Sequence, residues 1–123
     1  MTDNPGFIYL AAPYSTGLIA TSPTVRRVAM VRRRHRIDTA AAQLIAEGHV
    51  VYSPVSHSCA IEPHIRTTMT HDDWLKQCRP LLLAARELRV LMLPGWRESR
   101  GVALEIEWAT AAGIPVGYME GGV

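Results

Sequence analysis

The chain has 123 residues and a mass of 13.6 kDa, enough for one ordinary domain with its own core. Hydrophobic residues make up 48% and charged residues 20% of the sequence, which excludes a disordered tail, a collagen-like repeat and a small disulfide scaffold. The 13 basic and 11 acidic residues give a net charge of +2, too small to indicate a nucleic-acid-binding protein by charge alone. We therefore expect a single domain over residues 1–123.

In the first half of the chain, an apolar run over 7–11 predicts a buried strand. Residues 12 to 23 are rich in Pro, Ser, Thr and Gly and predict a loop after that strand. Ser22 and Pro23 are typical of the N-cap and first residue of a helix, which should run to about Glu47 and end at Gly48. Its apolar stripe is expected to include the residues Val25, Val28, Ala29, Ile37, Ala40, Ala41, Leu44 and Ile45. Residues 49–52 predict a second strand.

In the second half, residues 53–69 predict a long polar loop with at most one helical turn. Thr70 is expected to cap a helix that Pro80 kinks or divides. A third strand is expected over 88–93, and Ser99 should cap a last helix that runs to about Ala112. Residues 114–118 predict the last strand.

Apolar strands that alternate with helices indicate an α/β fold, with a mainly parallel sheet of about four strands between two layers of helices. In such three-layer sandwiches, ligands bind beyond the carboxyl ends of the strands. This rule selects three loops as candidates for the site, at 12–15, 53–58 and 94–101.

The segment 94–105 carries the strongest chemical signal. Ser99 at a helix N-cap, followed by Gly101, leaves backbone N–H groups that favour an anion such as phosphate, and Arg100 lies beside them. Glu105 lies one turn after Gly101, on the same face, among apolar neighbours. It can be an ordinary exposed charge, but those neighbours favour a half-buried acid that acts as a nucleophile.

Asp72 and Asp73 open a predicted helix, where acids commonly complement the helix dipole. Paired with Glu105, one of them would suit glycosidic chemistry, in which one acid attacks carbon and another protonates the leaving group. Tyr9, inside a buried strand, needs a partner for its hydroxyl, and a nearby carboxylate is one candidate.

The segment 53–58 should supply hydroxyl and imidazole groups to the rim of the same cleft. Zinc is not expected, because the spacing of the candidate ligands His57, Cys59, His64 and His71 fits no standard pattern. Neither a phosphate-binding glycine loop nor a dinucleotide fingerprint occurs in the sequence, so we expect no nucleotide cofactor and no metal.

Six arginines lie between Arg26 and Arg36. They are spread around the predicted helix and no aromatic residue interleaves them, so we expect a solvated face or a subunit contact. A nucleic-acid surface is kept only as a weaker third hypothesis.

Two cysteines, Cys59 and Cys78, and an N-terminus without a cationic segment before a long apolar run predict a cytoplasmic protein with reduced thiols. The longest apolar runs fall far short of the ~20 residues that span a bilayer.

Three motifs, at residues 7–14, 53–58 and 94–105, together resemble the nucleoside 2-deoxyribosyltransferase-like superfamily. The resemblance covers nearly the whole chain, and the chain is similar to a branch of small bacterial and phage proteins. The resemblance implies a flavodoxin-like, or Rossmann-like, fold that cleaves the N-glycosidic bond of nucleosides or nucleotides. It also implies that Glu105 is the nucleophile and that Tyr9 positions it.

The sequence departs from that superfamily in two ways. Cys78 stands near the place where many members have a base-facing Asp, so Asp72 or Asp73 can serve only if the register differs. The chain ends soon after the last strand, whereas better characterised members have further segments that close the site. A neighbouring subunit would complete it, which predicts a homo-oligomer.

The leading hypothesis is a deoxyribosyltransferase-like enzyme or nucleotide N-glycosidase, with a nucleoside or its 5′-monophosphate as substrate and water or a second base as acceptor. The alternative is a non-catalytic nucleotide-sensing module. The expected catalytic residues are Glu105, Tyr9 and either Asp72 or Asp73. The expected substrate-binding residues are Ala12, Pro13, Tyr14, Ser53, Ser56, His57, Gly95, Trp96, Ser99, Arg100 and Gly101.

Overall fold

The computed structural model describes residues 5–18 and 21–121. In chain order the elements are β1 (Ile8–Ala11), α1 (Pro23–Ala46), β2 (Val51–Tyr52), α2 (Pro54–Ile61), a 3-10 turn η1 (Glu62–His64), α3 (His71–Leu83), β3 (Glu87–Met92), α4 (Arg100–Ala111) and β4 (Val116–Glu120).

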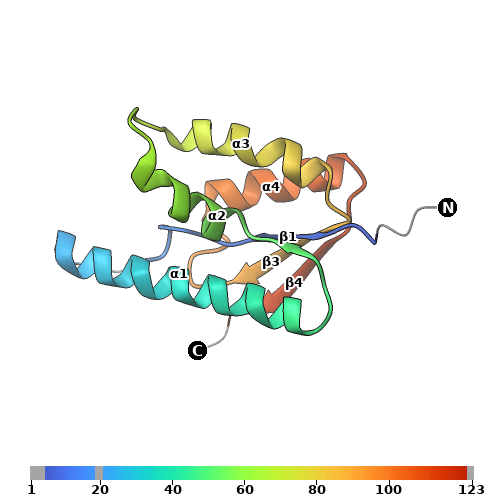
Figure 1. Ribbon diagram of the computed structural model, residues 1–123, viewed down its shortest axis with the longest axis horizontal. Helices are drawn as coiled ribbons and strands as arrows, with labels where there is room; N and C mark the ends of the chain where they lie inside the picture. Colours follow the sequence, from blue (N-terminus) through green and yellow to red (C-terminus); the bar gives the residue numbers. More distant parts are fainter. Residues whose placement is uncertain (1–4, 19–20, 122–123) are drawn as a thin grey trace.

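The four strands form one parallel sheet in the order β2-β1-β3-β4. Helix α1 lies against one face, and α3 and α4 lie side by side against the other (Figure 1). The structure confirms the predicted α/β, Rossmann-like three-layer sandwich with a parallel sheet of four strands. The strand order reverses direction between β1 and β3, so the carboxyl ends of these two strands form the crevice where ligands bind in such folds.

The core has two halves, one on each face of the sheet. On the α1 face, Ile37 and Leu44 pack with Leu10 and Leu91. On the other face, Tyr9 and Leu88 contribute to a cluster with residues of α3 and α4. Because successive residues of a strand point to opposite faces, Leu10 joins the first cluster and Tyr9 the second.

Three predicted helix starts are confirmed. The Ser22 hydroxyl accepts from the Val25 N–H at the start of α1, and the Ser99 hydroxyl accepts from the Val102 N–H at the start of α4. Thr70 caps α3. This helix does not divide at Pro80 but continues to Leu83.

The prediction of a polar loop over residues 53–69 is wrong for residues 54–64, which form α2 and η1. The Ser53 hydroxyl accepts from the Ser56 N–H, and Pro54 occupies the first helical position. These two residues start α2 in the same way as Ser22 and Pro23 start α1.

The predicted apolar stripe of α1 is wrong at its ends. Val25, Val28 and Ile45 are 45%, 48% and 56% exposed, whereas Arg33 is buried. The N-terminal part of α1 projects beyond the sheet, so no layer covers its valines (Figure 1).

The loops that follow β1 and β3 touch each other at the carboxyl edge of the sheet. Gly17 and Gly95 both have positive φ angles, and a Cβ on Gly95 would lie 2.6 Å from the Gly17 Cα. The buried Arg33 guanidinium donates hydrogen bonds to the carbonyls of Thr16 and Pro94, one in each loop. Arg33 and the two glycines therefore hold the crevice together, and Arg33 does not belong to the solvated arginine face that was expected. No helix of the described segments is long and apolar enough to cross a membrane.

Candidate active site

The site is centred on a buried carboxyl group. Glu105 is 6% exposed and lies in the second turn of α4. The Tyr9 hydroxyl, from the middle of β1, donates a hydrogen bond to its Oε2 atom. Because Tyr9 is fully buried in a central strand, its ring is fixed, and the expected partner of its hydroxyl is indeed a carboxylate.

Burial decides the protonation of this pair. Burial raises the pKa of Glu105 to about 7, and the hydrogen bond from Tyr9 partly opposes that rise by favouring the charged form. Burial and the Glu105 charge raise the pKa of Tyr9 far above its usual value, so its hydroxyl stays a donor. Glu105 is therefore a carboxylate near its titration point at neutral pH, with one oxygen held in place.

The other carboxyl oxygen is accessible. Among the described residues no hydrogen bond reaches the Glu105 Oε1 atom, and no buried side-chain oxygen lacks a partner. Oε1 is therefore not buried, and the opening next to Glu105 is a pocket that this residue lines. An oxygen atom that is oriented but unpartnered is suited to attack an electrophilic carbon.

The pocket has a volume of about 140 Å³ and is open at one side. The loop after β1 and the helices α2, α3 and α4 form its walls. Its lining residues are Ala12, Tyr14, Pro54, Val55, Ser58, Cys59, Glu62, His71, Trp74, Cys78, Ser99, Gly101, Val102 and Glu105. Most of this surface is apolar, which suits the flat face of an aromatic ring.

Five of the residues predicted from the sequence meet in this pocket, together with Tyr9 through its hydrogen bond. They are Ala12, Tyr14, Ser99, Gly101 and Glu105. Gly101 is buried and faces the His71 ring, and a Cβ on Gly101 would lie 3.5 Å from that ring. Pro13 is fully buried beside the pocket and does not line it.

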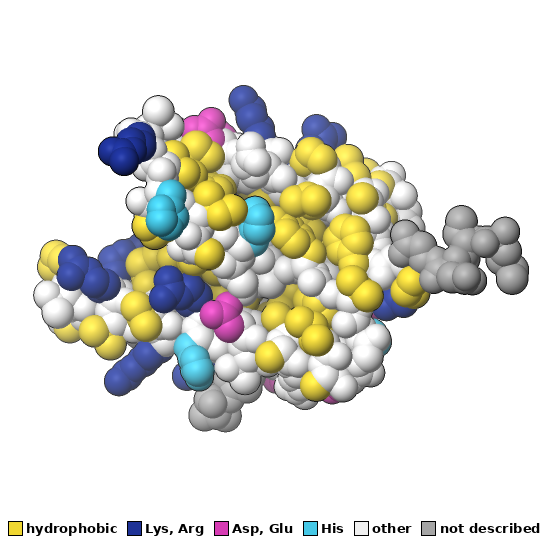
Figure 2. All heavy atoms as spheres, in the orientation of Figure 1, with side chains coloured by type: hydrophobic (Ala, Val, Ile, Leu, Met, Phe, Trp, Pro, Cys, Tyr) yellow, Lys and Arg dark blue, Asp and Glu magenta, His cyan; other side chains and the backbone are white. Residues whose placement is uncertain are grey.

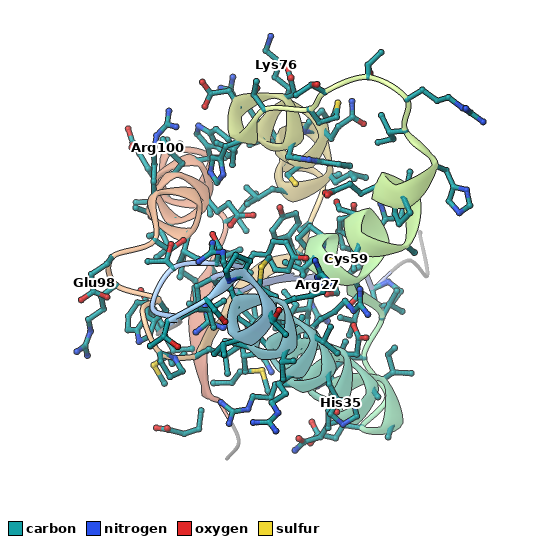
Figure 3. All side chains as sticks on the ribbon, turned by 90° about the vertical axis from the view of Figure 1, so that its left-hand side faces the viewer. Arg27, His35, Cys59, Lys76, Glu98 and Arg100 are labelled. Atoms are coloured by element: carbon teal, nitrogen blue, oxygen red, sulfur yellow. The ribbon has the colours of Figure 1, made fainter. Side chains whose placement is uncertain are left out.

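The structure does not bring the two predicted acids into the pocket. Asp73 forms a capping box with Thr70, accepting from the Thr70 backbone N–H at 2.9 Å, and this contact lowers the pKa of Asp73. Asp72 is exposed and pairs with Arg100 at 3.0 Å. Both carboxylates stabilise the start of α3 instead of facing Glu105. Because Arg100 pairs with Asp72, its side chain points away from the pocket (Figure 3).

Two other predicted groups lie in separate hollows. The first contains Ser53, Ser56 and His57: the Ser56 hydroxyl donates to Asp38, and the His57 ring packs at a tilt against Tyr52 with ring centres 5.6 Å apart. The second contains Gly95 and Trp96, and the Trp96 ring packs at a tilt against Tyr118. The first group was expected at the rim of the cleft and the second was expected to bind substrate, but neither group lines the Glu105 pocket.

Several residues that were not assigned to the site from the sequence also line the pocket, although the resemblance had placed Cys78 near a base-facing position. His71, Trp74 and Cys78 lie on one face of α3, at the spacing i, i+3, i+7 that was available in the sequence. Burial raises the pKa of the Cys78 thiol. Glu62 and Cys59 come from the α2–η1 segment. This segment was expected to be a loop, so helical periodicity was not used to predict which of its side chains face the pocket.

Across residues 5–18 and 21–121, no cluster of three or more His, Cys, Asp or Glu side chains is arranged to hold a metal ion. The chemistry that the pocket offers is that of Glu105, its Tyr9 donor and the polar groups of Glu62 and His71.

The model of a family described as a domain of unknown function, DUF1937, matches residues 6–121, which include every element of the fold and the whole pocket. No curated protein matches the chain.

Proposed function

The chain belongs to the DUF1937 family, whose description states no activity, and from the site itself we propose that it cleaves or transfers the N-glycosidic bond of a nucleoside or nucleotide. Glu105 is the nucleophile and Tyr9 orients it. The observation that carries the proposal is the buried Tyr9–Glu105 hydrogen bond at the wall of an apolar pocket, located where the strand order reverses.

The reaction needs a carboxylate that attacks the anomeric carbon of the sugar. One oxygen of Glu105 forms a bond to that carbon while the carbon–nitrogen bond breaks, and the electron pair leaves on the base. Water or a second base then attacks the same carbon and releases Glu105. The Tyr9 hydrogen bond keeps part of the Glu105 population ionised despite its burial, which the attack requires.

The departing base takes up a proton, and the pocket offers two groups for this role. Glu62 and His71 both line it, whereas Asp72 and Asp73 do not. We propose Glu62 or His71 as the acid in place of the two aspartates. The ring of Trp74 and the apolar Val102 and Pro54 give the base a surface to pack against.

The resemblance of the strand-end motifs to the nucleoside 2-deoxyribosyltransferase-like superfamily supports the same assignment for Glu105 and Tyr9. The support is independent of the pocket, because the resemblance rests on motifs along the sequence and the pocket rests on geometry.

The test is base release from a panel of ribonucleosides, deoxyribonucleosides and their phosphates, followed by chromatography, with and without a second free base. Glu105→Ala should lower turnover by orders of magnitude, because the covalent step is lost. Glu107→Ala is the matched control, since Glu107 is exposed on the same helix. Equal turnover of Glu105→Ala and wild type would refute the mechanism.

A second candidate is a nucleotide-sensing module that keeps the pocket but not the reaction. The observation that favours it is the engagement of Asp72 and Asp73 outside the pocket, while Cys78 lies inside it. Saturable nucleotide binding, with no base release from any substrate in the panel, would select this candidate.

A further inference from the structure

The described residues that line the Glu105 pocket include no Lys or Arg, although a nucleotide carries phosphate. The pocket's formally charged side chains are the carboxyl groups of Glu62 and Glu105. The start of α4, where Ser99 and Gly101 were predicted to hold a phosphate, has no cation directed into the pocket, because Arg100 pairs with Asp72. A chain of several phosphates therefore has no cationic partner in the Glu105 pocket.

A second hollow, of about 380 Å³, shares Tyr14 with the Glu105 pocket. We call it the arginine pocket: its lining residues are Tyr14 and, from α1, Pro23, Arg26, Arg27, Met30, Val31 and Arg34. Tyr14 thus separates the reacting centre from a surface with three guanidinium groups. Lys and Arg side chains gather over the projecting end of α1 in Figure 2, and Figure 3 looks at the same end, with Arg27 on α1 and Cys59 on α2 labelled.

The arginines of α1 lie in different environments. Arg33 holds the two loops and Arg36 lines the hollow beside Trp96, whereas the arginine pocket collects three others on one helix face. Neither of the two salt bridges among the described residues involves these three. Within the described part of the chain, these three guanidinium groups line one hollow without a carboxylate in a salt bridge to them, so they are free to pair with an anion from solution.

One further feature, the helix dipole of α1, adds to the positive potential of the arginine pocket. The first turn of α1 contains no acidic residue, and its N-terminal residue Pro23 lines the hollow, so the positive end of the helix dipole is uncompensated there. Both pockets act on Tyr14: burial, the Cys59 thiol and the Glu62 charge raise the pKa of Tyr14 to about 12, and the Arg34 charge opposes that rise.

We propose that the arginine pocket binds the phosphate chain of a substrate with two or more phosphates, while its sugar and base occupy the Glu105 pocket across Tyr14. Three guanidinium groups, each a planar fork of donors, match the several oxygens of a diphosphate or triphosphate better than a single phosphate. This inference rests on the proposed function for the location of the sugar, but the binding of the phosphate chain is testable without any turnover.

The experiment is a calorimetric titration of the full chain with pyrophosphate, and then with a nucleoside and its mono- and triphosphate. We expect affinity to increase with the number of phosphates and to fall as salt concentration rises. Arg27→Gln/Arg34→Gln should weaken pyrophosphate binding by about tenfold or more. Arg27→Gln alone, at an exposed position, should weaken it by a smaller factor.

The control is Arg32→Gln, an exposed arginine of the same helix that lines neither pocket, and it should bind pyrophosphate as the wild type does. Equal pyrophosphate affinity in the double variant and in Arg32→Gln would overturn the inference. So would tighter, arginine-dependent binding of a single-stranded oligonucleotide than of the triphosphate, because it would make this face a nucleic-acid surface.

The experiments distinguish failure of the phosphate site from failure of the proposed function. Arginine-dependent binding of the triphosphate without base release would overturn the proposed function and leave the phosphate site. Base release from nucleosides, with pyrophosphate affinity unaffected by the arginine substitutions, would overturn the phosphate site and leave the proposed function.

Discussion

Replacing Glu105 with Gln should stabilise the fold, and the gain should grow with pH. Burial raises the pKa of Glu105 to about 7 in the folded chain, above its usual value of 4.5. The unfolded chain therefore releases this proton more readily than the folded chain, and stability falls as pH rises from 4.5 to 7. Gln has the same shape, can accept the Tyr9 hydrogen bond through its carbonyl oxygen, and carries no charge to bury.

The magnitude follows from the two pKa values. At about 1.4 kcal/mol for each pH unit between them, ionising the buried carboxyl costs about 3 kcal/mol of stability above pH 7. At pH 5 most of this cost is absent, because the folded chain keeps the proton, and about 1 kcal/mol remains. The stability difference between Glu105→Gln and wild type should therefore increase by about 2 kcal/mol between pH 5 and pH 8.

Urea unfolding of both proteins at several pH values measures this difference, and the change with pH is the informative quantity. Any constant effect of the amide on hydrogen bonding or packing cancels in that comparison. Glu107→Gln, exposed on the same helix, is the matched control and should follow the wild type. A stability difference for Glu105→Gln that is the same at pH 5 and pH 8 would show that Glu105 is not buried in its charged form.

The other predictions concern the residues that hold the site. Tyr9→Phe removes the donor to Glu105, so it should cost about 1–3 kcal/mol in urea unfolding and move the pH profile of base release to higher pH. Arg33→Met leaves two loop carbonyls without their donor and should cost about 2 kcal/mol or more, seen as a lower Tm. Gly95→Ala should lower the free energy of unfolding more than Gly48→Ala, which should cost only about 1 kcal/mol because of its positive φ. A Cβ on Gly95 would meet the neighbouring loop, whereas a Cβ on Gly48 would meet nothing. Similar unfolding midpoints for the two alanine variants would contradict the close approach of the loops.

The parts of the fold that depend on local chemistry could be predicted from the sequence. Ser22 and Ser99 cap their helices because a hydroxyl at that position accepts a free N–H. The apolar strands predicted the parallel sheet. The apolar neighbours of Glu105 predicted a half-buried acid, and the structure buries it further, to 6% exposure. The helix after Ser53 was missed although the same Ser-Pro signal is present there, because residues 53–69 were interpreted together as one polar loop.

The parts that depend on tertiary contacts could not be predicted. A run of arginines gives no sign that Arg33 alone turns inward, because its partners are two carbonyl groups in loops 17 and 61 positions away along the chain. Asp72 and Asp73 were assigned to the site by their type, but the start of α3 uses both of them. Which carboxylate faces a pocket depends on the rotation of its helix about the helix axis. Sequence periodicity predicts that rotation only when the face of the helix that packs on the core is already known.

The contact between the loops after β1 and β3 has a consequence for how this pocket can diversify. Because Gly17 and Gly95 meet backbone to backbone and one guanidinium ties the two loops, an insertion in either loop would push against the other. Under the proposed function, related chains with different base preferences should therefore vary on the opposite wall, in the segment from α2 to the start of α3. A library that randomises residues 58–71 should yield altered base preference in folded proteins, whereas one that lengthens the loop at 94–98 should yield unfolded ones.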